Sequence, residues 1–177
     1  MKPKRKAKPK PSPAYADFMA RAYTMELDAT ERYTQFADQM EAHNNAEVAQ
    51  LFRRLAQVEA LHAKRILAEM GWPSVPALPV AFAWPGAEAP ETPPFDELHY
   101  LMQPYHALKI ALRCEEQAVA YFSGIARRKP PKPVLAAAKE MAEEEREHVK
   151  LIQEWLARVP KPTADWDHDM DPPAVTE

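Results

Sequence analysis

The sequence predicts an all-α protein that folds as an antiparallel four-helix bundle, and three observations lead to this prediction. The nineteen prolines leave long proline-free runs between proline-rich segments, which span 3–13, 73–94, position 104, 130–133 and 160–173. Because proline interrupts helices, this distribution is typical of long helices and their connectors. The runs are rich in Ala, Glu, Leu, Gln, Met and Arg, which favour the helix. No stretch shows the alternation of apolar and polar residues that is typical of strands.

Length, charge and cysteine content exclude several classes of protein. At 177 residues the chain suits one domain with a hydrophobic core. A single cysteine, Cys114, excludes an internal disulfide and any site built on several cysteines. The net charge of −3 gives no indication of a nucleic-acid partner. No apolar run approaches the roughly 20 residues that span a membrane, and no apolar signal segment begins the chain. We therefore expect a cytoplasmic protein without a membrane partner.

Both ends of the chain are predicted to be disordered. Residues 1–13 carry six positive charges and four prolines, and the segment from 159 to 177 is acidic and proline-rich. Neither segment can bury enough apolar surface to fold. A basic arm at residues 2–10 could contact nucleic acid, but a solubilising tail is the favoured interpretation.

The first helix is predicted over residues 14–41. Its apolar positions recur at alternating spacings of four and three, as in one buried helix face, and comprise Tyr15, Met19, Ala22, Ala29, Tyr33, Phe36 and Met40. Glu26 occupies a position midway along this face. A carboxylate there is costly to bury unless it is protonated, paired or bound to a cation.

The second helix is predicted over residues 46–70, after a polar turn in which Asn44 or Asn45 could cap it. Gly71 is a typical helix end. The buried face comprises Val48, Phe52, Leu55, Glu59, His62 and Ile66. The polar exceptions again fall at its middle, and here there are two.

The connector over residues 72–94 is unusually long for a compact domain. A helix of this protein's predicted length is about 40 Å long, and an extended chain can cover that distance. We therefore expect a crossover that runs the length of the bundle, so that the second and third helices are parallel. Trp72, Phe82 and Trp84 are its expected packing anchors.

The third helix is predicted to begin between Phe95 and Pro104 and to end near Arg128, and the fourth to span residues 134–158. The apolar positions of the third are Leu101, Leu108, Ala111, Ala118, Phe122 and Ile125, and those of the fourth are Ala138, Met141, Ile152, Trp155 and Val159. Glu115 interrupts the apolar face of the third helix. Glu145 and His148 interrupt that of the fourth.

The two halves of the chain form an internal repeat. The surroundings of Glu26 match those of Glu115, 89 residues later, and Glu59-x-x-His62 matches Glu145-x-x-His148 after 86 residues. A Glu and a His three apart share one helix face. Four carboxylates and two imidazoles are thus predicted to converge inside one bundle. Two divalent cations would balance the four carboxylates, and iron or manganese, with zinc as an alternative, suit these ligands.

These residues resemble the ferritin-like di-iron carboxylate proteins, whose four-helix core takes one Glu from each of two helices and Glu-x-x-His from the other two. The resemblance covers residues 14–158 and is strongest to rubrerythrin-type and bacterioferritin-type domains. It implies two iron ions bridged by Glu59 and Glu145. It further implies terminal ligands, which would be Glu26 and His62 at one ion and Glu115 and His148 at the other.

The resemblance also implies a role for Tyr33 as a hydrogen-bond partner of a ligand carboxylate in catalysis. Three departures qualify the match. Rubrerythrins typically carry another Glu where Ala118 stands, and commonly a four-cysteine rubredoxin module that this chain lacks. Phe122 stands at the position that corresponds to Tyr33, so the two metal positions should differ.

The expected function is Fe(II) oxidation or peroxide reduction, with O₂ or H₂O₂ as substrate and an external electron donor. One alternative is a di-iron hydroxylase acting on an organic substrate, which would need a large apolar pocket at the metals. Another is a non-catalytic metal-binding or DNA-associated protein. Related bundles often dimerise, so a homodimer is expected.

Overall fold

The computed structural model describes residues 11–78, 82–86 and 88–170. Four long helices and one short 3-10 helix make up its regular structure, namely α1 (Pro13–Ala42), α2 (Ala46–Met70), η1 (Phe95–Glu97), α3 (Pro104–Arg127) and α4 (Lys132–Leu156). No strand occurs within these described ranges. The predicted all-α class is therefore confirmed. The basic arm at residues 2–10 lies outside the described residues.

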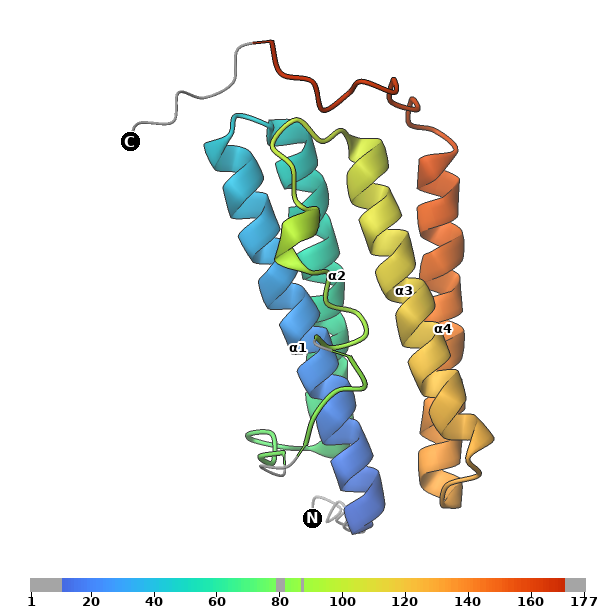
Figure 1. Cartoon of the computed structure of the whole chain (residues 1–177). Coiled ribbons are helices and arrows are strands. Elements are labelled where there is room, and N and C mark those ends of the chain that lie inside the picture. The colour runs from blue at the N-terminus through green and yellow to red at the C-terminus, as the bar shows by residue number, and fades with distance from the viewer. Residues whose placement is uncertain (1–10, 79–81, 87, 171–177) are drawn as a thin grey trace, which may run out of the picture.

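The helices form two antiparallel hairpins that pack side by side, one from α1 and α2 and the other from α3 and α4 (Figure 1). The connector from α2 to α3 runs along the bundle from one end to the other, so α2 and α3 are parallel. This is the predicted four-helix bundle with a long crossover. Helix α1 also contacts α4, and α2 contacts α3, which closes the bundle around a common interior.

Local signals in the sequence set most of the helix ends. The Ser12 side chain accepts a hydrogen bond from the Tyr15 backbone N–H at the start of α1, and Asn45 caps α2 in the same way. Helix α2 ends at Gly71, whose φ of 62° lies in the left-handed region that glycine tolerates best. Pro104 stands in the first turn of α3, where its missing N–H costs no helical hydrogen bond.

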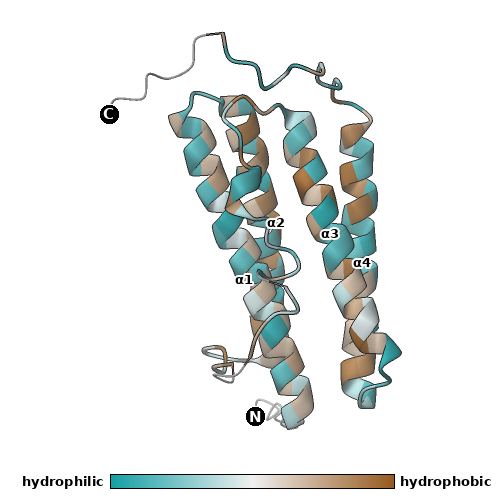
Figure 2. Ribbon diagram, viewed as in Figure 1, coloured by the Kyte–Doolittle hydropathy of each residue, from teal (hydrophilic) through white to brown (hydrophobic). Residues whose placement is uncertain are grey.

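The hydrophobic core is divided into two clusters along the bundle axis. One cluster contains Phe36 and Phe52, and the other contains Phe18 and Phe122. On every helix, the boundary between the clusters falls at the glutamate that interrupts the apolar face. Figure 2 shows that hydrophobic and hydrophilic residues alternate along each of the four helices, as expected of helices with one buried face. A polar layer therefore crosses the middle of the core.

The connector and the C-terminal segment pack against the bundle through aromatic residues. Trp72 and Trp84 are partly buried against the second cluster, and the Trp84 ring centroid lies 5.8 Å from that of Tyr121. After α4, Trp166 lies against His106 with ring centroids 3.8 Å apart. Part of the tail predicted to be disordered thus contacts the bundle. None of the described helices combines the length and the apolar character needed to cross a membrane.

Candidate metal centre

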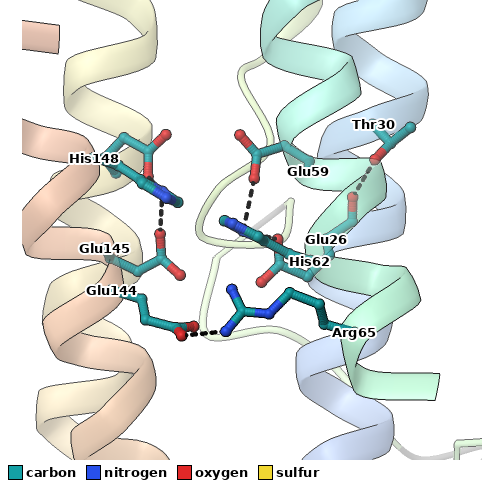
Figure 3. A network of polar contacts seen from close by, with 9 residues as sticks. Glu26, Thr30, Glu59, His62, Arg65, Glu144, Glu145 and His148 are labelled. Atoms are coloured by element: carbon teal, nitrogen blue, oxygen red, sulfur yellow. Dashed lines mark hydrogen bonds and ion pairs between the residues drawn. The ribbon is translucent and has the colours of Figure 1, made fainter. Parts of the chain in front are cut away.

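The polar layer contains all six predicted ligands. Each hairpin contributes one glutamate from its first helix and a Glu-x-x-His pair from its second. The glutamates are buried, with exposed fractions of 3% or less. The residues are Glu26, Glu59 and His62 from the first hairpin and Glu115, Glu145 and His148 from the second. Figure 3 shows side chains of the two hairpins pointing toward one another.

Each histidine lies between the two carboxylates of its own hairpin. In the first hairpin, His62 Nδ1 is 3.6 Å from Glu26 Oε2 and 3.5 Å from Glu59 Oε2. In the second, His148 Nδ1 is 3.3 Å from Glu115 Oε2 and 2.9 Å from Glu145 Oε2. The two halves of the internal repeat therefore build matching sites.

The two imidazole rings stack across the interface between the hairpins. Their centroids are 4.7 Å apart and their planes differ by 8°. This nearly parallel stacking places His62 and His148 side by side at one face of the layer. They join the two halves of the site into a single cluster.

Burial gives the layer unusual electrostatics. It raises the pKa of Glu26 to about 8 and that of Glu115 to about 8, with neighbouring carboxylates adding to the shift and the nearby histidine opposing it. Burial alone would lower the pKa of each histidine. The adjacent carboxylates outweigh it and raise the pKa of His62 to about 10 and that of His148 to about 11. In the metal-free protein the layer therefore retains protons at neutral pH.

A seventh residue, Glu91, lies in the same layer and was not predicted. It belongs to the crossover, has no exposed surface, and places a carboxylate oxygen within 4.8 Å of oxygens of Glu59 and Glu115. Burial, with four neighbouring carboxylates, raises its pKa well above the ordinary value. The connector has no helical period, so nothing in the sequence distinguishes Glu91 from the exposed Glu88 three residues earlier.

Tyr33 lies beside the layer, fully buried on α1. Its hydroxyl has no hydrogen-bond partner among the described residues. Burial, together with the nearby charges, raises its pKa well above the ordinary value. The predicted hydrogen bond from Tyr33 to a ligand carboxylate is thus not found among the described residues, and the role of Tyr33 stays a prediction.

The donor set fits a pair of metal ions. Apart from the ion pairs with histidine described above, both carboxylate oxygens of Glu59 and one each of Glu26 and Glu145 are buried without a hydrogen-bond partner among the described residues. The potential ligand atoms form three groups, and within each group the atoms lie within 4.8 Å of one another. The groups are Glu26/Glu59/His62, His62/Glu145/His148 and Glu59/Glu91/Glu115. Buried carboxylates without partners are costly, and bound cations would satisfy them. Carboxylate and imidazole donors suit iron and manganese, and also zinc.

The fold and this layer together define a ferritin-like four-helix bundle with a carboxylate–histidine centre. Residues 17–72, which include the first half of the site, match the family model described as rubrerythrin. A solved structure, that of an uncharacterized conserved protein from Magnetospirillum magnetotacticum, shares 35% sequence identity with a TM-score of 0.62. The match covers 84% of this chain and 97% of that one. No significant match was found among curated proteins. The chain belongs to the rubrerythrin family, whose members generally bind two iron ions.

Proposed function

We propose that this protein is a di-iron redox protein that oxidises Fe(II), reduces peroxide, or does both. The observation that carries the proposal is the layer of buried carboxylate oxygens without partners, flanked by two histidines, in a bundle of the rubrerythrin family. When bound, the two ions would each supply one electron to O₂ or H₂O₂. Manganese would also suit the ligands, whereas zinc would bind without redox chemistry.

The protein's own contribution is to fix the ligands and exclude water. All six predicted ligands lie on long helices, where packing fixes their orientation. Hydrophobic clusters close the layer on both sides along the bundle axis. Such a shell controls solvent access and the reduction potential of a bound metal.

The size of the cavity beside the site favours a small oxidant. The cavity that reaches Glu26 and His62 has a volume of about 50 Å³, whereas a cavity needs roughly 10–15 Å³ to hold one water molecule. Pockets for organic ligands are usually larger than about 300 Å³. O₂ and H₂O₂ are small enough for this space. The alternative of a hydroxylase with an organic substrate is therefore less well supported.

An external electron donor follows from the same proposal. The only cysteine, Cys114, is buried, and burial raises the pKa of its thiol to about 12. A neutral, buried thiol is unsuited to metal binding or redox exchange. Return of the centre to its reduced state would require a partner protein or a small reductant.

Anaerobic Fe(II) titration followed by O₂ or H₂O₂ tests the proposal. We expect two Fe(II) ions per chain by elemental analysis, and two ferric ions per chain by absorption after the oxidant is added. Glu59→Ala should abolish binding of the pair, because this carboxylate lies in two of the three potential ligand groups. Glu147→Ala is the matched control, since Glu147 is exposed beside the centre on α4.

Unchanged iron stoichiometry in Glu59→Ala would refute the assigned site. Two bound ions that neither O₂ nor H₂O₂ oxidises would refute the redox function while leaving the site intact. Circular dichroism of both variants ensures that a loss of iron does not reflect a loss of the fold.

A homodimer and a nucleic-acid contact through residues 2–10 stay predictions. Sedimentation velocity would measure the first. Salt-dependent DNA retention that disappears on deletion of residues 2–10 would support the second.

A further inference from the structure

The crossover between α2 and α3 places a carboxylate inside the bundle that no helical pattern accounts for. Glu91 has no exposed surface, and neither of its carboxylate oxygens has a hydrogen-bond partner among the described residues. Its potential ligand atom groups with those of Glu59 and Glu115, but with neither histidine. Glu91 therefore approaches the layer from a different direction than the stacked imidazoles.

Contacts with α1 hold this part of the crossover in place. The Arg32 guanidinium, itself buried, donates a hydrogen bond to the Pro93 carbonyl and pairs with Glu88 Oε1 at 3.1 Å. It also lies over the Phe95 ring, 3.8 Å from the centroid. One cation on α1 thus fixes the chain on both sides of Glu91.

A turn and a second ion pair complete the attachment. The Thr92 N–H donates to the Ala89 carbonyl at 2.9 Å, which closes a turn around Glu91. At the last residue of η1, Glu97 pairs with Arg113 of α3. Both hairpins therefore hold the segment 88–97.

None of these cations neutralises Glu91 itself. Arg32 and Arg113 pair with Glu88 and Glu97, and no ion pair to Glu91 occurs among the described residues. An ordinary buried salt bridge therefore does not account for it. A buried carboxylate without a partner calls for a cation or a proton.

We propose that Glu91 is a seventh ligand of the metal pair, supplied by the crossover to an ion that Glu59 and Glu115 also bind. The inference rests on the proposed di-metal centre and deepens it. Metal binding then includes the crossover, so the loaded protein holds residues 88–97 more tightly than the metal-free protein does. Arg32 is a positioning residue, because it holds the turn that aims Glu91 into the layer.

Anaerobic Fe(II) binding to Glu91→Gln tests the inference, with hydrogen exchange of residues 88–97 as a second measurement. Glutamine keeps the size of the side chain and removes its charge. Loss of a partner that only orients a metal ligand costs roughly tenfold or more in affinity, so we expect loss of this direct ligand to weaken one of the two ions by at least about tenfold. In the wild-type protein, Fe(II) should slow exchange over 88–97, and in Glu91→Gln this protection should be lost. Circular dichroism shows that the variant is folded.

Asp96→Asn is the matched control, because Asp96 is an exposed carboxylate in the same segment. It should bind both ions with wild-type affinity and keep the Fe(II)-dependent protection. Arg32→Met should speed hydrogen exchange over residues 88–97 even without metal. It should also weaken the binding of the same ion that Glu91→Gln affects. This pattern separates positioning from direct ligation.

Three outcomes distinguish failure of the inference, failure of the proposed function and failure of both. If wild-type protein binds two ions and Glu91→Gln binds both equally well with unchanged protection, the seventh ligand is refuted and the redox proposal stands. If two ions bind through Glu91 but resist oxidation, the redox proposal fails and the ligand assignment stands. If wild-type protein binds no iron, both fail.

Discussion

The metal-free protein should lose stability as the pH rises from about 5 to 8. Burial raises the folded-state pKa of both Glu26 and Glu115 from 4.5 to about 8. In this window the unfolded chain has released both protons while the folded chain still holds them. Folding therefore becomes less favourable with increasing pH, because the folded state binds more protons. The raised pKa values of His62 and His148 act in the same direction above 6.5.

The magnitude follows from the number of retained protons. Each one changes the free energy of unfolding by about 1.4 kcal/mol per pH unit. Below pH 6.5 the histidines are protonated in both states, so each Glu–His pair holds one proton more in the folded chain than in the unfolded chain, the proton of its glutamate. Two pairs give a decrease of roughly 3 kcal/mol per pH unit, and the raised pKa of Glu91 adds to it in the same direction. This is a large share of the 5–15 kcal/mol that is typical of a domain.

Urea unfolding of chelator-treated protein at several pH values between 5 and 8 measures this slope. Glu26→Gln should reduce it by about 1.4 kcal/mol per pH unit, because one titrating group is removed. The Fe(II)-loaded protein, kept anaerobic, should show the opposite trend, since metal ions compete with protons for the same ligands. A metal-free protein whose stability is flat or increases from pH 5 to 8 would refute this account of the layer.

Three further variants test the scaffold around the centre. Phe52→Ala should cost about 3–5 kcal/mol in urea unfolding, because this fully buried ring packs on Tyr33 and Phe36 at centroid distances of 6.0 and 5.2 Å. Gly71→Ala should cost about 1 kcal/mol by the same assay, because alanine is strained at the φ of 62°. No clash adds to this cost, since no atom lies within 4 Å of an added Cβ. Arg65→Met should change stability by less than about 1 kcal/mol, because its pair with Glu144 is partly exposed. In stopped-flow mixing, Arg65→Met should also speed Fe(II) uptake, because it removes a positive charge from the wall of the cavity at Glu26.

The bundle could be predicted closely where local chemistry sets the helix ends. Helix α2 has its predicted bounds because an Asn cap and a glycine stop mark both ends. Helix α4 begins two residues before the prediction, at Lys132, and ends at Leu156. Its ends lack a side-chain cap, and Pro133 is tolerated in the first turn. Boundaries without such signals depend on packing, which the sequence does not display.

The residues of the candidate centre likewise fall into those that the sequence predicts and one that it does not. Six of its residues could be found because each interrupts a periodic apolar face, and burial then makes a carboxylate or imidazole conspicuous. Glu91 interrupts no periodic pattern. Its position depends on the Arg32 contacts, which join residues about 60 positions apart along the chain. Only the tertiary structure reveals such a residue.

Glu91 breaks the symmetry that the internal repeat gives to the centre. The two hairpins alone would present matching Glu, Glu and His donors to two ions, with the two imidazoles stacked where the hairpins meet. The crossover then adds Glu91 near Glu59 and Glu115. If Glu91 is a ligand as proposed, five carboxylates would exceed the four positive charges of two divalent ions, and we expect the centre to favour ions of higher charge. Such a site would stabilise ferric over ferrous iron, and this preference would come from the connector rather than from the helices.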